Sequence, residues 1–199
     1  IALRGFDMGV DIIMQALTKY QSGGSDVLMG AVITRDAALN ERVAMAHMRL
    51  GMGVSADDAY LVMRGLPSMK LRFDGHDAGA RKVAQWLKAR PEIARVLHPA
   101  FEDCPGHEHW KRDFTGAGGL FSVLFDARYT EAQTDRFVDS LELFGLGYSW
   151  GGANSLVMPY RIQAMRKGWQ DGGMLVRFNI GLEDTADLIA DIERALKAL

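Results

Sequence analysis

The sequence predicts an α/β protein that opens with two buried strands and ends in a small α/β domain with a mainly antiparallel sheet. Three observations carry this prediction. Residues 7–17 and 27–34 are apolar runs rich in β-branched side chains, which is typical of buried strands. Residues 36–90 show apolar positions at helical spacing. After residue 91, short strand-like runs alternate with helical segments.

Three helices are expected between the second strand and residue 90. Asp36 is a plausible N-cap of the first, and Ser55 opens the second, which ends before Pro67. Residues 70–90 predict a long amphipathic helix of the kind that commonly links two domains. Its apolar face is formed by Ala80, Val83, Ala84 and Leu87.

Beyond Pro91 we expect three strands and two helices. The strands are predicted at residues 93–97, 118–125 and 174–180. The helices are predicted at about residues 130–143 and from Glu183 or Asp184 to the end. The last helix places one apolar stripe on a single face, formed by Leu188, Ile189, Ile192, Leu196 and Leu199.

Composition excludes several classes of function. Hydrophobic residues make up 48% of the 199 residues and charged residues 24%, and the net charge of −2 lacks the basic excess of a nucleic-acid binder. No apolar run approaches the roughly 20 residues that span a bilayer, so we expect no membrane insertion. The single Cys104 fits a reducing, cytoplasmic setting. Because the chain does not begin with Met, we expect it to be the C-terminal half of a longer protein.

No metal site is expected. His107 and His109 flank Glu108 in a polar stretch without further ligands nearby, which favours a surface role. Met45, Met48 and Met52 favour an adaptable core or a subunit interface.

Lys19 is the main candidate for chemistry. It lies between the first two predicted strands, in a connection too short for a helix, and Gly23 and Gly24 follow it. A lysine that forms a Schiff base needs such a desolvated place at the end of a rigid element. Thr18 offers a hydroxyl and a backbone N–H that can reach a phosphate. Taken alone, the loop favours a solvated surface lysine.

Ordered motifs along the whole chain resemble the Cys/Met-metabolism family of pyridoxal-phosphate (PLP) enzymes. The lysine motif is Thr18-Lys19-Tyr20 followed by Gly-Gly-Ser-Asp at residues 23–26. The other matching segments are Arg64-Gly65-Leu66, His98-Pro99, Gly106-His107-Glu108, residues 110–116, residues 148–152, Ser155-Leu156 and residues 176–184. The resemblance implies a fold-type-I architecture, of the aspartate-aminotransferase type, with the end of the PLP-binding large domain in residues 1–70, a connecting helix in 71–90 and a small domain in 91–199.

Tyr148-Ser149-Trp150 resembles the bacterial cystathionine β-lyase branch of this family. The resemblance implies that Lys19 carries PLP as a Schiff base and that Thr18 lies at the cofactor. It also implies that Tyr148, Ser149 and Trp150 line the substrate side. Arg177 would bind the substrate α-carboxylate, and a guanidinium on an apolar strand is costly to bury without such an anion. The alternative for Arg177 is an internal ion pair with an Asp or Glu.

The expected activity is a β-elimination that converts the amino-acid thioether L-cystathionine to homocysteine, pyruvate and ammonia. A cystathionine γ-lyase, a methionine γ-lyase or a cysteine-S-conjugate β-lyase stays open, and so does a non-enzymatic fragment. The resemblance also implies partners: the upstream half of the polypeptide and a homotetramer built as a dimer of dimers.

Overall fold

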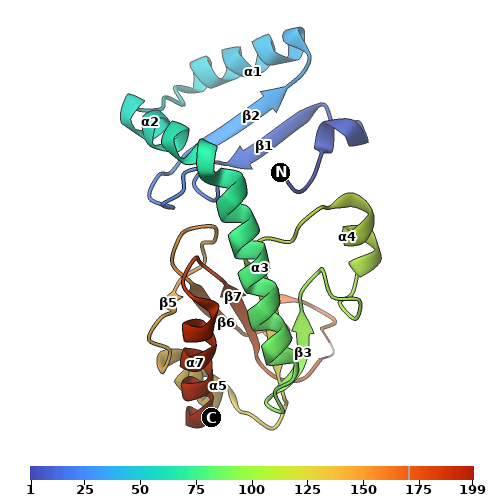
Figure 1. The fold of residues 1–199 in the computed structure, drawn as a ribbon. Helices are drawn as coiled ribbons and strands as arrows, with labels where there is room; N and C mark the ends of the chain where they lie inside the picture. Colours follow the sequence, from blue (N-terminus) through green and yellow to red (C-terminus); the bar gives the residue numbers. More distant parts are fainter. Residues whose placement is uncertain (170) are drawn as a thin grey trace.

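The strands form two separate sheets in the computed structural model, which describes residues 1–169 and 171–199 (Figure 1). The first sheet has two antiparallel strands, β1 (Ile12–Ala16) and β2 (Gly30–Thr34). The second has five strands in the order β3-β4-β7-β6-β5. They are β3 (Ile93–Leu97), β4 (Leu120–Phe125), β5 (Gly145–Leu146), β6 (Leu156–Tyr160) and β7 (Leu175–Asn179). Only the β5–β6 pair is parallel, so the mainly antiparallel sheet is confirmed.

Both predicted N-caps are confirmed. The Asp36 carboxylate accepts a hydrogen bond from the Leu39 N–H at 2.7 Å, and the Ser55 hydroxyl accepts one from the Asp58 N–H at 3.0 Å. Each cap satisfies a backbone donor that the helix itself leaves free. The helices that follow are α1 (Ala37–Leu50) and α2 (Ala56–Gly65), and a short 3₁₀ turn, η2 (Leu66–Ser68), leads into α3 (Met69–Lys88).

Helix α3 runs from the two-stranded sheet to the five-stranded sheet, where it packs beside α7 (Thr185–Ala195) (Figure 1). Its predicted apolar face is buried in the main core. Helix α5 (Glu131–Asp139), which starts with a Thr130–Gln133 capping box, contributes Phe137 and Val138 to the same core. From the sheet, the core takes alternate strand residues, among them Phe121, Val123, Val157, Val176 and Phe178. The opposite face of the sheet therefore carries the residues between them.

The sequence did not predict β5, β6, α4 (His107–Asp113) or α6 (Ile162–Met165). Pro159 hides the strand pattern of β6, because proline is unusual inside a sheet. Strand β5 pairs only with Leu156 and Val157, so Pro159 lies where β6 has an open edge and the missing N–H is tolerated.

The two N-terminal strands are not buried, contrary to the prediction. Residues 5–8 form the 3₁₀ turn η1 (Gly5–Met8), and strand β1 starts only at Ile12. Met14 is 75% exposed and Val32 is 48% exposed. The physical reason is that two strands with one adjoining helix, α1, cannot enclose a core. Within the described ranges, no helix has both the length and the apolar run that a bilayer crossing needs.

His98 is fully buried directly after β3. Its ring stacks on Phe101 with centroids 4.8 Å apart, and its Nδ1 accepts a hydrogen bond from the Ala100 N–H. Burial, reinforced by the Arg81 guanidinium and opposed by Asp77, lowers the pKa of the His98 imidazole from 6.5 to about 4. The folded protein therefore holds this ring neutral at a pH where the unfolded chain protonates it.

We expect His98 to make the protein less stable in acid. Between pH 6.5 and 4 the unfolded state binds a proton that the folded state does not, so the free energy of unfolding falls as the pH drops through this window. The loss from His98 is at most about 3 kcal/mol. His98→Asn keeps an acceptor for Ala100 and removes the titration, so urea unfolding at pH 7, 5.5 and 4.5 should show a flatter pH dependence. An unchanged slope would contradict this assignment.

Candidate functional site

The loop that carries Lys19 is closed by its own side chains. The Ser22 hydroxyl donates to the Thr18 carbonyl at 3.0 Å and accepts from the Ser25 N–H at 3.1 Å. Across the loop, the Thr18 hydroxyl accepts from the Met29 N–H at 3.2 Å, and the Thr18 N–H donates to the Met29 carbonyl at 3.3 Å. The turn between β1 and β2 is therefore fixed at both ends, and Lys19 projects from a rigid support.

The Lys19 amine meets two of the predicted site residues. Its Nζ donates to the Ser149 hydroxyl at 2.9 Å and lies 4.2 Å from the centroid of the Trp150 ring. Within residues 1–169 and 171–199, no carboxylate lies within the 4.0 Å of an ion pair with this amine. The half-buried amine is thus held by a neutral hydroxyl and an aromatic face, and the surface-lysine alternative does not describe its surroundings.

Gly151 brings the Ser149-Trp150 segment directly onto the lysine loop. Its φ of +78° is in the left-handed region, and a Cβ at this position would lie 2.9 Å from the Tyr20 backbone nitrogen. The Gly151 N–H donates to Asn179 Oδ1 at 3.3 Å, which ties the segment to the end of β7. Only glycine permits this backbone-to-backbone approach.

Tyr20 joins the lysine loop to the start of β4. Its hydroxyl accepts a hydrogen bond from the Gly119 N–H at 2.8 Å, and its ring packs edge-on against Phe73 and His76, each at a centroid distance of 5.2 Å. Burial raises the pKa of the Tyr20 phenol, and the Gly119 hydrogen bond only partly offsets this effect. The Tyr20 carbonyl also accepts from Arg72 Nη1 at 2.6 Å. The residue next to the lysine is therefore anchored to both α3 and the five-stranded sheet.

Arg177 lies on β7 between two core residues, Val176 and Phe178, so its side chain emerges on the sheet face opposite the core. Its Nη2 donates to the Gly147 carbonyl at 3.4 Å, and its guanidinium lies 5.7 Å from the centroid of the Tyr160 ring. No carboxylate of the described residues pairs with it, so the internal ion pair considered as the alternative is not formed. A half-buried guanidinium without an acid is suited to bind an external carboxylate.

The two remaining predicted site residues, Tyr148 and Thr18, differ in exposure. Tyr148 is 63% exposed and packs edge-on against Tyr160, with centroids 6.0 Å apart, so the segment 147–151 reaches both Arg177 and Lys19. Thr18 is buried, and its hydroxyl and N–H are both used by Met29. Its phosphate contact stays a prediction.

Four residues that hold the site were not assigned a role from the sequence: Tyr20, Gly151, Tyr160 and Asn179. All except Tyr160 belong to motifs already visible in the sequence. Asn179 carries the one usable signal, because a polar residue between apolar strand positions needs a buried partner. The contacts of Tyr20 and Tyr160 depend on tertiary packing and have no local signal.

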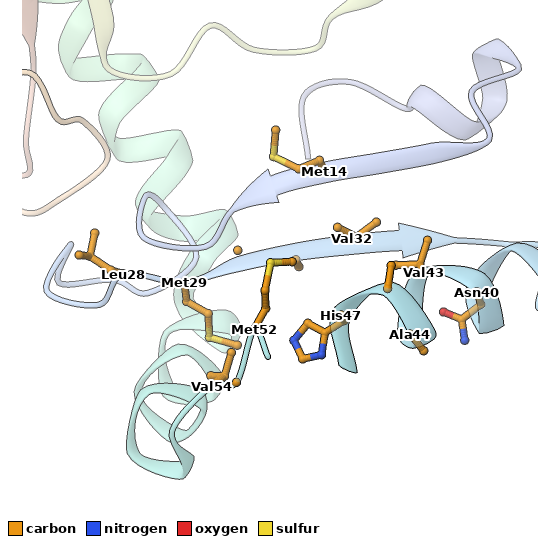
Figure 2. A pocket seen from close by; sticks show the side chains of 14 residues that line it. Met14, Leu28, Met29, Val32, Asn40, Val43, Ala44, His47, Met52 and Val54 are labelled. Atoms are coloured by element: carbon orange, nitrogen blue, oxygen red, sulfur yellow. The ribbon is translucent and has the colours of Figure 1, made fainter. Parts of the chain in front are cut away.

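A separate apolar groove of about 840 Å³ lies between the two-stranded sheet and α1 (Figure 2). Figure 2 shows Met29, Met52 and His47 among the side chains that line it. Lys19 and Arg177 do not line this groove. The methionines that the sequence favoured as core or interface, Met45, Met48 and Met52, are all exposed.

Comparison with known proteins identifies relatives of this chain. Residues 1–197 match the family model described as Cys/Met metabolism PLP-dependent enzyme. The chain is 45% identical to a putative cystathionine beta-lyase of Rhizobium johnstonii, covering 100% of this chain and 51% of the relative. It is 40% identical to cystathionine beta-lyase MetC of Escherichia coli, covering 97% of this chain and 50% of the relative. It thus spans about half the length of the curated relatives it matches.

Relatives with other names match as well. An L-alanine/L-glutamate racemase of Wolbachia pipientis is 37% identical and covers 100% of this chain and 50% of the relative, and an L-methionine gamma-lyase of Pseudomonas deceptionensis is 35% identical and covers 98% and 51%. A crystal structure of cystathionine gamma synthase from Xanthomonas oryzae in complex with cystathionine has a TM-score of 0.88 at 32% identity, covering 99% of this chain and 52% of that one. The predicted fold class, part of a fold-type-I PLP enzyme, is confirmed by these likenesses.

We expect Tyr20→Phe to destabilise the folded protein while leaving the ring packing in place. The variant leaves the Gly119 N–H without its partner, which costs about 1–2 kcal/mol for a buried donor. Tyr60→Phe is the matched control, because Tyr60 is 59% exposed. Urea unfolding monitored by circular dichroism should separate the two variants. Equal free energies of unfolding for both would show that the Tyr20–Gly119 bond does not hold the loop.

Proposed function

Because this chain belongs to the Cys/Met metabolism family of PLP-dependent enzymes, we propose that it forms the lysine-bearing half of a cystathionine β-lyase. Such an enzyme cleaves L-cystathionine by β-elimination and releases homocysteine, pyruvate and ammonia. The observation that carries the proposal is the contact of the Lys19 amine with Ser149 and Trp150. Ser149 and Trp150 belong to the segment by which the sequence resembles the β-lyase branch.

The residues of this chain fit the attachment of PLP. Lys19 supplies a primary amine whose partner is a hydroxyl, and an amine that is not paired with a carboxylate suits reaction with a carbonyl carbon. Gly151 keeps the space beside the lysine backbone free of a side chain. When bound, the cofactor supplies an electron sink for the negative charge that develops at the substrate Cα.

Lys19 Nζ is proposed to be both the point of attachment and the base that takes the Cα proton. The Ser149 hydroxyl accepts a hydrogen bond from Nζ and so fixes the position of the amine. The Trp150 ring lies 4.2 Å from Nζ and stabilises the ammonium that forms when the proton arrives. The same ring excludes water from one side of the amine.

Arg177 is proposed to bind the α-carboxylate of the substrate. Its guanidinium is half-buried on the sheet face opposite the core and has the planar fork of donors that matches a carboxylate. The Tyr160 ring lies beside it, and Tyr148 packs against Tyr160. With the carboxylate fixed at Arg177, the Cα–H bond is oriented for transfer to Lys19, which is a positioning effect.

We place the complete site in a larger assembly of the upstream half of the polypeptide and a homotetramer, built as a dimer of dimers, in the cytoplasm. The chain corresponds to about half of its relatives, which supports a contribution from residues outside it. The apolar lining of the groove between β2 and α1, and the 93% exposure of Leu28, support a covering partner on that side.

We expect the purified full-length enzyme to convert L-cystathionine to pyruvate and homocysteine in equal amounts. Keto acids are identified by chromatography after derivatisation, and thiols are quantified in parallel. The Lys19→Arg variant is the matched control, because it keeps the positive charge but cannot attach the cofactor. A γ-lyase would instead yield 2-oxobutanoate and cysteine, and an amino-acid racemase would yield neither keto acid. Either result would exclude the β-lyase.

A further inference from the structure

Strand register places Tyr160 beside Arg177. In the antiparallel pair of β6 and β7, Met158 lies opposite Arg177 and Tyr160 lies opposite Leu175. Residues directly opposite share a face, and side chains two positions apart on one strand share it too. Tyr160 is therefore the diagonal neighbour of Arg177 on the face away from the core, within the reach of an aromatic side chain.

Two contacts hold the Arg177 guanidinium, one with an aromatic ring and one with a backbone carbonyl. Its carbon lies 5.7 Å from the centroid of the Tyr160 ring, inside the range of a cation–π interaction. Its Nη2 donates to the Gly147 carbonyl, which in the described part of the chain is the one hydrogen-bond acceptor found for this side chain. Tyr148 packs against the ring at an interplanar angle of 71°. Tyr160 thus packs against Tyr148 on one side and contacts the Arg177 guanidinium on the other.

We propose that Tyr160 is a positioning residue that holds Arg177 ready for the substrate carboxylate; this inference rests on the proposed role of Arg177. An aromatic ring suits this task better than an acid does. A ring attracts the guanidinium cation through its π-face and takes none of the N–H donors. An Asp or Glu would occupy the edge that the substrate carboxylate needs. Pre-ordering the long Arg side chain also lowers the entropy lost on binding.

The test compares Tyr160→Leu, which removes the ring, with Tyr160→Phe, which keeps it. KM and kcat are measured for the amino-acid substrate that the wild-type enzyme turns over. We expect Tyr160→Leu to raise KM about 3- to 10-fold, the range of a cation–π contact, with kcat changed less than about 2-fold. Tyr160→Phe should restore a KM close to that of the wild type.

Two further arms separate positioning from a general loss of structure. Tyr160→Met keeps apolar volume without a ring and should match Tyr160→Leu in KM, so it replaces that variant if the leucine protein unfolds. In an Arg177→Ala background, which itself should raise KM markedly, Tyr160→Leu should add less than about 2-fold, because both changes act on one contact. Thermal unfolding and cofactor absorbance confirm that each variant is folded and loaded.

Each outcome decides the inference. An unchanged KM in both ringless variants would overturn it, as would a full additional rise in the Arg177→Ala background. If Arg177→Ala itself leaves KM unchanged, the carboxylate role in the proposed function falls and the inference falls with it. If Arg177→Ala raises KM and the ringless variants do not, only the role of Tyr160 is lost. These readings do not depend on whether the wild type cleaves at the β or the γ carbon.

Discussion

The Gly151 backbone packs against the backbone of Lys19 and Tyr20, and the positions of Ser149 and Trp150 beside the lysine amine depend on this contact. A glycine at φ +78° is needed there, because a Cβ would strike the Tyr20 nitrogen. The contact brings Ser149 and Trp150 to the lysine amine, although about 130 residues separate them in sequence. Asn179 holds the other side of Gly151 and lies two residues beyond Arg177 on β7. Strand β7 thus carries both Arg177 and the residue that holds the Gly151 segment beside the lysine amine.

The two sheets differ in how well they are packed. The five-stranded sheet has a continuous core beneath α3, α5 and α7, whereas β1 and β2 carry the lysine loop with exposed apolar side chains around them. The lysine loop is anchored to the well-packed part through Tyr20. The Tyr20 hydroxyl accepts a hydrogen bond from the Gly119 N–H, and the Tyr20 carbonyl accepts one from Arg72 on α3. The residue next to Lys19 thus ties the loop on the two-stranded sheet to α3 and to the start of β4.

Local patterns were sufficient to predict much of the fold. The Asp36 and Ser55 caps, the buried stripe of α3 and the strand at 93–97 follow from side-chain chemistry and periodicity, which act over a few residues. Strand β6 was missed because Pro159 contradicts the usual strand pattern, and β1 and β2 were expected to be buried because burial depends on what covers them. Lys19 and Arg177 were proposed as site residues from motifs, and Asn179 had a signal as a polar residue between apolar strand positions. The contacts of Tyr20 and Tyr160 arise between distant segments and leave no local signal.

The central claim is that Lys19 Nζ is the point where the cofactor attaches. Its most direct test is reduction of the PLP-loaded, purified enzyme with borohydride, followed by proteolysis and mass spectrometry of the labelled peptide. We expect the visible absorbance of the bound cofactor to disappear and a single phosphopyridoxyl adduct to appear on Lys19, within the peptide that contains Thr18 and Tyr20. An adduct on any other lysine, or a loaded enzyme that yields no adduct, would contradict the account.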